Sequence, residues 1–251
     1  MTVLDIPGDA GRVVDVLRGG GVAIIPMEIG YAGLGGCEAA LTRFFRAKGR
    51  GAHKRNAMLG SLPIHDEVHV LEPQAKGMVR ALVEDYDLPV SVVAPYRPDH
   101  PLLRALGEGA LEASSDGGTV AVLLNAGALQ TAVAERGHAV GQPVFGSSAN
   151  LTGTGTRFRA ADIQPEIRAA ADLVVDYGLM KYHAYRRSST MIDFRTMEVI
   201  RIGSCYELVC DVLGRHFGVE LPPDPGLETL PSGHVREAQR RYGQAPPPAP
   251  P

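Results

Sequence analysis

The residues best suited to chemistry form a short run of small and hydroxyl side chains, Gly146–Gly153, with the sequence GSSANLTG. The run follows the apolar residues 143–145, so we expect it to be the turn at the end of a strand. Backbone amides in such a turn can approach a ligand closely, and serine and asparagine add neutral donors and acceptors. The run alone is a weak signal, because ordinary turns are rich in the same residues.

A basic cluster strengthens this signal. It contains Lys48, Arg50 and Lys54, and glycines flank Arg50 on both sides. Lysine can bind phosphate as a point charge and arginine as a bidentate fork, while the glycines permit close backbone approach. The alternative is that these cations only complement the dipole at the end of a helix.

A second basic cluster lies before the last pair of predicted strands. It contains Lys181, His183, Arg186 and Arg187, and it is followed by hydroxyl residues at 188–190. This cluster is either a solvated loop or a lid over a polyphosphate. Arg201, at the end of the last predicted strand, could be a ligand or a surface residue.

The segment His65-Asp66-Glu67-Val68-His69 resembles a metal motif, because its two histidines are four residues apart. No third ligand with suitable spacing is evident, and the acidic residue after the first histidine is not the expected glutamate. We therefore predict no metal site here and expect a solvated helix start. Cys37 is expected to be a small buried residue.

Strands and helices alternate along most of the chain, which predicts an α/β sheet with flanking helices. Residues 27–36 contain four glycines and are predicted to be a loop. The predicted strands are 22–26, 56–62, 88–95, 119–124, 143–145, 173–176, 189–193 and 198–201. The predicted helices are 9–17, 38–48, 73–87, 101–113, 128–135, 160–171 and 206–217.

The composition of the chain bears on its core, its charge and its division into domains. The chain has 251 residues, 45% of them hydrophobic and 21% charged, so a real core is expected, and the net charge of −3 argues against a general polyanion binder. We predict one domain over residues 1–220 and an extended or disordered proline-rich tail over 221–251. The three cysteines do not have the spacing of a metal site, and we see neither a signal peptide nor a membrane span. We therefore predict a cytoplasmic protein with no membrane partner.

Four stretches together resemble the YrdC-like family of threonylcarbamoyl-AMP synthases. They are Pro26–Gly35, Lys48-Gly49-Arg50, Ser147–Gly153, and Ser189–Asp193 followed by Ile200–Gly203. The resemblance covers roughly residues 9–206. It implies a twisted, mostly open mixed sheet with a basic concave face.

The resemblance also implies a reaction. Family members use ATP, bicarbonate and L-threonine, usually with Mg²⁺, to form a carbamoyl-adenylate and pyrophosphate. A protein partner then uses the product for tRNA modification. Related domains of carbamoyltransferases start from carbamoyl phosphate.

Residue roles follow from the resemblance. Catalytic roles are expected for Lys48, Arg50, Ser148 and Asn150. Nucleotide binding is expected for Lys54, Thr119, Ser147 and Arg201. Substrate binding is expected for Ile29, Tyr31, Leu123 and Ser189.

The departures from the family pattern lie on the amino-acid side. Met27 and Ile29 stand where the family usually has threonines, and Leu123 stands where it usually has an arginine for the amino-acid carboxylate. The acceptor amine therefore need not be threonine, and small-molecule biosynthesis is an alternative to tRNA modification. Two other hypotheses are an RNA-binding module without catalysis and a carbamoyltransferase component. The low aromatic content, 6%, argues against base stacking in the former.

Overall fold

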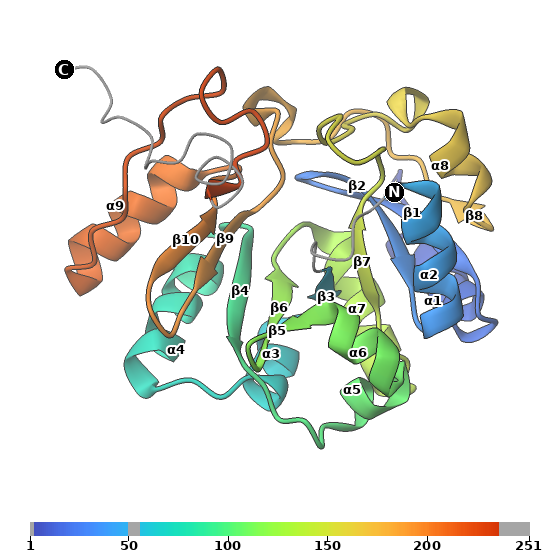
Figure 1. Ribbon diagram of the computed structural model, residues 1–251, viewed down its shortest axis with the longest axis horizontal. Helices are drawn as coiled ribbons and strands as arrows, with labels where there is room; N and C mark the ends of the chain where they lie inside the picture. Colours follow the sequence, from blue (N-terminus) through green and yellow to red (C-terminus); the bar gives the residue numbers. More distant parts are fainter. Residues whose placement is uncertain (1–2, 50–55, 236–251) are drawn as a thin grey trace.

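The computed structural model describes residues 3–49 and 56–235, which form a mixed α/β fold with helices around a twisted, open sheet (Figure 1). The sheet has ten strands in these residues, with the order β10-β9-β4-β6-β3-β7-β2-β1-β8, and β5 pairs with β6. Both parallel and antiparallel neighbours occur. This confirms the predicted fold class.

The strands are short, and most of them coincide with the predicted ones. Their bounds are β1 Val22–Met27, β2 Gly30–Gly35, β3 Ala57–Leu59, β4 Val90–Pro95, β5 Ser115–Asp116, β6 Thr119–Leu124, β7 Phe145–Ser148, β8 Leu173–Val174, β9 Thr190–Asp193 and β10 Glu198–Arg201.

The helices cover the sheet. Their bounds are α1 Ile6–Arg18, α2 Glu38–Ala47, α3 Leu62–Val68, α4 Pro73–Arg80, α5 Pro101–Leu106, α6 Glu108–Ser114, α7 Ala128–Ala139, α8 Pro165–Ala169 and α9 Tyr206–Phe217, with short η segments at Ala81–Asp85, Ala160–Asp162 and His183–Tyr185. Figure 1 shows α1, α2 and α8 near β1, β2 and β8, and α4 and α9 near β9 and β10 at the other end of the sheet. None of the helices in the described residues is long and apolar enough to cross a membrane.

The prediction of a loop over residues 27–36 was wrong, because β2 forms an antiparallel hairpin with β1 there. Gly30 has a φ of +117° at the turn between the two strands, whereas Gly33 is needed for packing. A Cβ atom on Gly33 would lie 2.1 Å from the Phe44 ring, and that ring is fully buried. The glycines thus let α2 lie directly on the strand.

This contact leads to a testable expectation. Gly33→Ala should lower the free energy of unfolding by about 1–3 kcal/mol, because the buried Phe44 ring has no room to move away. Gly77→Ala in α4 is the matched control, since its nearest non-neighbouring atom would be 3.8 Å from the new Cβ. Urea unfolding of both variants tests this, and equal stability of the two would refute the packing argument.

Other predicted helices are shorter than expected. The helix over 101–113 is divided into α5 and α6 at Gly107, whose φ is +93°. Only residues 165–169 of the predicted 160–171 helix are α-helical. Helix α9 has the predicted bounds.

The segment after α9 lacks long helices or strands but packs on the domain as far as it is described. Leu230 is 3% exposed, and the Ile202 amide donates to the Gly233 carbonyl at 2.8 Å. Residues 236–251, with most of the terminal prolines, lie outside the described residues. The domain boundary at 220 remains a prediction.

Candidate functional site

The run Gly146–Gly153 begins inside β7 and leaves the sheet as a loop. β7 pairs with both β2 and β3, and Ser147 and Ser148 lie opposite Gly33 and Ala32. A Cβ on Gly146 would lie 2.3 Å from the Gly33 carbonyl oxygen, so only glycine fits there. The Ala149 amide then donates to the Tyr31 carbonyl at 2.8 Å, which fixes the start of the loop.

Lys48 holds this loop in place. Its Nζ donates to the carbonyl oxygens of Ser148 and of Asn150, the latter at 2.7 Å, and lies 5.5 Å from the centre of the Phe44 ring. The Lys48 side chain is buried, with 2% exposure of the residue. The Lys48 carbonyl in turn accepts from the Thr152 amide at 2.9 Å. The end of α2 and the loop after β7 are therefore tied together by charge-assisted hydrogen bonds.

Two buried polar atoms of the loop have no hydrogen-bond partner in the described part of the chain. Asn150 donates from Nδ2 to the Leu151 carbonyl at 2.6 Å, which leaves Oδ1 as an acceptor without a donor. The Thr152 hydroxyl is also buried without a partner. Because unpaired buried polar atoms are rare and costly, these two atoms point to a ligand or an ordered water.

A second group of predicted residues lies across the sheet. Arg201 donates from Nε to the Ser189 carbonyl at 2.8 Å and from Nη2 to the Ser189 hydroxyl at 2.9 Å. The Ser189 hydroxyl is 2.7 Å from that of Ser91, which is the register partner of Leu123. In the strand order, β6 and β3 lie between β7 and β4, the strand that carries Ser91. The sheet therefore places this group and the loop after β7 on different strands.

The remaining predicted site residues that the structure describes are buried or hydrogen-bonded within the protein. Ile29 is 1% exposed in the core. The buried Tyr31 hydroxyl contacts Asp176 Oδ1 at 2.7 Å, and burial raises its pKa. The Thr119 hydroxyl donates to the Asp116 carbonyl at 2.6 Å. Their ligand roles remain predictions, and Arg50 and Lys54 lie outside the described residues.

The second basic cluster is divided between partners. Lys181 pairs with Glu28 at 3.0 Å on the surface, whereas Arg187 is buried and pairs with Asp224 at 2.6 Å. His183 and Arg186 are exposed. These pairings use two of the cations inside the protein itself.

The expectation of a solvated helix start at His65 and His69 was wrong, because both residues are buried, with 1% and 0% exposure. Their Nδ1 atoms lie 2.8 Å apart. Cys37 is half-buried rather than buried. In the described residues, a His/carboxylate group instead forms from Glu67, His100 and His138, whose ligand atoms lie within 4.8 Å of one another. Sequence spacing gave no sign of it, since three separate elements supply it.

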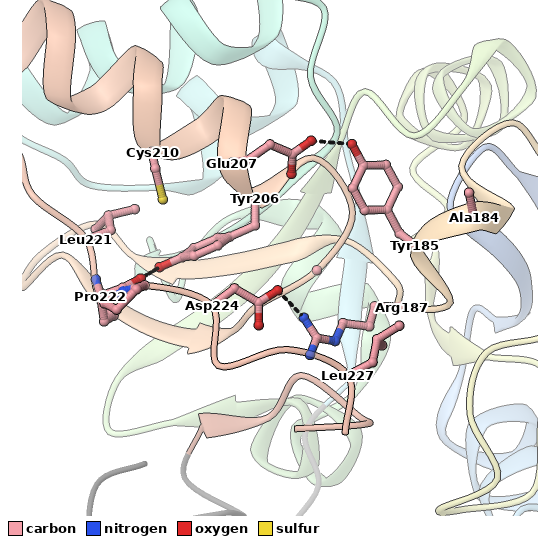
Figure 2. Close-up of a pocket in the computed structure, with 12 residues that line it drawn as sticks. Ala184, Tyr185, Arg187, Tyr206, Glu207, Cys210, Leu221, Pro222, Asp224 and Leu227 are labelled. Carbon is pink, nitrogen blue, oxygen red and sulfur yellow. Dashed lines mark hydrogen bonds and ion pairs between the residues drawn. The ribbon is translucent and has the colours of Figure 1, made fainter. Parts of the chain in front are cut away.

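Sequence reasoning also missed a cavity of about 550 Å³ near the start of α9 (Figure 2). Its wall contains Arg187 of the second basic cluster but none of the residues to which a catalytic, nucleotide-binding or substrate-binding role was assigned. It is lined by Ala184, Tyr185, Arg187, Gly203, Tyr206, Glu207, Cys210, Leu221, Pro222, Pro223, Asp224 and Leu227.

The sheet topology and the loop after β7 define a YrdC-like α/β domain. A family model described as telomere recombination, Sua5/YciO/YrdC, matches residues 15–203, well over half of the sequence. The chain therefore belongs to the Sua5/YciO/YrdC family, as the sequence motifs predicted.

Solved structures show the same fold. A hypothetical protein, smu.1377c from Streptococcus mutans UA159, is 22% identical, with a TM-score of 0.70 over 83% of this chain and 92% of that one. P. abyssi Sua5 complexed with L-threonine is 21% identical, with a TM-score of 0.65 over 83% of this chain and 57% of that one. E. coli YciO is 18% identical, with a TM-score of 0.60 over 78% of this chain and 90% of that one. No curated protein sequence was found to match.

Proposed function

We propose that this chain is an ATP-dependent enzyme that forms a carbamoyl-adenylate-type mixed anhydride and releases pyrophosphate. Membership of the Sua5/YciO/YrdC family supports the proposal, and so does the likeness in fold to a Sua5 that was solved with L-threonine. The other reactants would be an amino compound with bicarbonate, or carbamoyl phosphate. A cytoplasmic location and a protein partner in tRNA modification stay predictions from the sequence.

The observation that carries the proposal is the unpaired carboxamide oxygen of Asn150 in the loop that Lys48 holds. An acceptor without a donor does not suit a phosphate oxygen, which is itself an acceptor. It suits an N–H or O–H group, and ATP offers both in its base amino group and its ribose hydroxyls. The Thr152 hydroxyl can donate or accept, so it suits either end of a nucleotide.

The triphosphate requires cations. ATP supplies an electrophilic phosphorus with pyrophosphate as the leaving group, and positive groups offset the charge that develops there. We assign this role to Arg201 and to the predicted residues Arg50 and Lys54. The loop itself has no carboxylate within Gly146–Gly153, so Mg²⁺ would be held mainly by the phosphates, as this ion often is in nucleotide sites.

The acceptor side favours a compound without a carboxylate at Leu123. In the register of the sheet, Leu123 lies between Leu59 in β3 and Ser91 in β4, and it is 5% exposed. A leucine there gives a carboxylate neither a charge nor a hydrogen bond. An amine without a carboxylate would fit the surroundings of Leu123 better than threonine. Carbamoyl phosphate would have to bind elsewhere.

The test is calorimetric titration of ATP with Mg²⁺, followed by pyrophosphate release with bicarbonate and a panel of amines, or with carbamoyl phosphate. Thr152→Val is the informative variant. It removes an unpaired buried hydroxyl at nearly constant volume, so stability should be unchanged or higher. If the hydroxyl contacts ATP, affinity should fall about tenfold, which corresponds to one hydrogen bond.

Thr154→Ala is the control, because the Thr154 hydroxyl is exposed and donates to the Leu151 carbonyl within the same loop. Unchanged ATP affinity in Thr152→Val would exclude this contact. Absence of ATP binding by the unaltered protein would contradict the proposed function as a whole.

A further inference from the structure

The cavity at the start of α9 has the volume of a small-molecule site, since such sites typically span about 300–1,000 Å³. Most of its wall lies beyond residue 203, where the family match ends. The first turn of α9 and the segment 221–227 supply that part. The cavity is therefore built largely by sequence outside the matched family domain.

A buried arginine forms part of the wall. Arg187 is 4% exposed and donates from Nη1 to Asp224 at 2.6 Å and from Nη2 to the Leu230 carbonyl at 2.7 Å. Its Nε is buried and has no hydrogen-bond partner among residues 3–49 and 56–235. A buried guanidinium N–H without an acceptor is unfavourable, so an acceptor from a ligand or an ordered water would stabilise this atom.

Two carboxylates lie nearer the solvent. Glu207 and Asp224 are exposed, and Glu207 accepts from the Tyr185 hydroxyl. Figure 2 shows the Glu207–Tyr185 and Arg187–Asp224 pairs. It also shows the Tyr206 side chain, whose hydroxyl donates to the Pro222 carbonyl at 2.5 Å. Two carboxylates against one guanidinium leave the charged wall with an excess negative charge, which favours a cationic group.

The rest of the wall is apolar or uncharged. Leucine, proline and tyrosine side chains form most of it, and burial raises the pKa of the Cys210 thiol, which keeps that group neutral. A ligand that fits must therefore combine an acceptor for Arg187, a cation for the acidic rim and an apolar body between them.

We propose that this cavity binds a small zwitterion of the amino-acid class with an apolar side chain. Its carboxylate accepts from Arg187 Nε, and its ammonium group lies beside Glu207 and Asp224. The proposal does not depend on the function proposed above, because it uses none of the residues of the loop after β7.

The experiment titrates L-leucine and L-phenylalanine, their amides and their N-acetyl derivatives into the full chain by calorimetry. The free amino acids should bind at least tenfold more tightly than either derivative, because each derivative lacks one charge. Glu207→Gln should weaken binding about tenfold, since it removes a carboxylate but can still accept from Tyr185. Asp211→Asn, the same change at an exposed position of α9 outside the cavity, should leave affinity unchanged.

Three results would overturn the proposal. They are no binding of either amino acid at millimolar concentration, equal binding of the acids and their amides, and equal effects of Glu207→Gln and Asp211→Asn. Binding that is lost in Asn150→Ala but kept in Glu207→Gln would also overturn it, because the amino acid would then occupy the loop after β7. If the unaltered protein does not bind ATP, that result contradicts the proposed function but does not affect the proposed amino-acid site.

Discussion

Replacing Lys48 by methionine is expected to lower the free energy of unfolding by about 3 kcal/mol, since each buried group left unpaired costs about 1–3 kcal/mol. Lys48 is 2% exposed and donates to the carbonyl oxygens of Ser148 and Asn150. Methionine keeps much of the volume but removes both donors. The Asn150 carbonyl then loses the Lys48 donor, and the Ser148 carbonyl keeps only the Asn150 amide, at 3.0 Å, among the contacts of the described residues.

Urea unfolding without nucleotide measures this effect. Lys181→Met is the matched control, because Lys181 forms a surface pair with Glu28 in which the side chains are 51% and 35% exposed. Such pairs contribute about 0–1 kcal/mol. If Lys48→Met costs no more stability than Lys181→Met, the clamp does not stabilise the loop.

The same variant bears on the predicted catalytic role of Lys48. A structural clamp and a phosphate ligand are different uses of one ammonium group. The clamp predicts a loss of stability in the absence of ATP. A phosphate contact predicts in addition that ATP affinity falls further in Lys48→Met than in Thr152→Val, which calorimetry can measure.

Acidification from pH 6.5 to about pH 4 is expected to destabilise the protein by about 3 kcal/mol through His65 alone, at about 1.4 kcal/mol for each unit by which the pKa is shifted. Burial lowers the pKa of His65 to about 4, and it lowers that of His69 as well. The unfolded chain binds protons at these histidines below pH 6.5, whereas the folded protein does not. Lowering the pH through this window therefore favours unfolding, and above it the two states bind equal numbers of protons.

Burial keeps the pair neutral by lowering both pKa values, and the hydrogen bonds of the pair determine its tautomers. The Val120 carbonyl only accepts, so His69 donates to it from Nε2 at 3.2 Å and accepts at Nδ1 from His65. His65 Nε2 is then a bare buried nitrogen, without a partner in the described residues. Protonation there would place a charge in the core with nothing to pair it.

Unfolding free energies measured between pH 6.5 and 5 test this, because most carboxylates titrate below that range. His65→Gln should reduce the dependence to the part that His69 contributes, and His183→Gln, at an exposed position, should leave the dependence unchanged. An unaltered protein that is equally stable at both pH values, or a slope that His65→Gln leaves intact, would contradict the assignment.

The sequence was sufficient for the larger elements. Apolar runs at 22–26 and 119–124 became β1 and β6, and the amphipathic pattern over 206–217 became α9. These segments carry their own signal, since hydrophobic periodicity and flanking glycines act within a few residues. The motif set from Pro26 to Gly203 likewise identifies the family from sequence alone.

Segments without that local signal were predicted less well. The glycines of residues 30–35 indicate a loop when read alone, yet this segment pairs with β1 and β7 as β2, and Gly33 leaves room for the Phe44 ring of α2. The 160–171 segment has helical spacing, but only its centre is α-helical. In both cases long-range packing decided the conformation, and propensity is a weak guide to packing.

The candidate site divides in the same way. Residue types at Gly146–Gly153 and at Lys48 led to the prediction that this loop carries the chemistry, and that role stays a prediction. The sequence could not show that the ammonium of Lys48 is used by two carbonyl groups 100 and 102 residues away. Nor could it show that Arg187 meets Asp224 at the wall of a cavity. Burial and pairing depend on which distant segments meet, so tertiary structure alone decided which polar atoms of the described residues are satisfied within the protein and which are left without a partner.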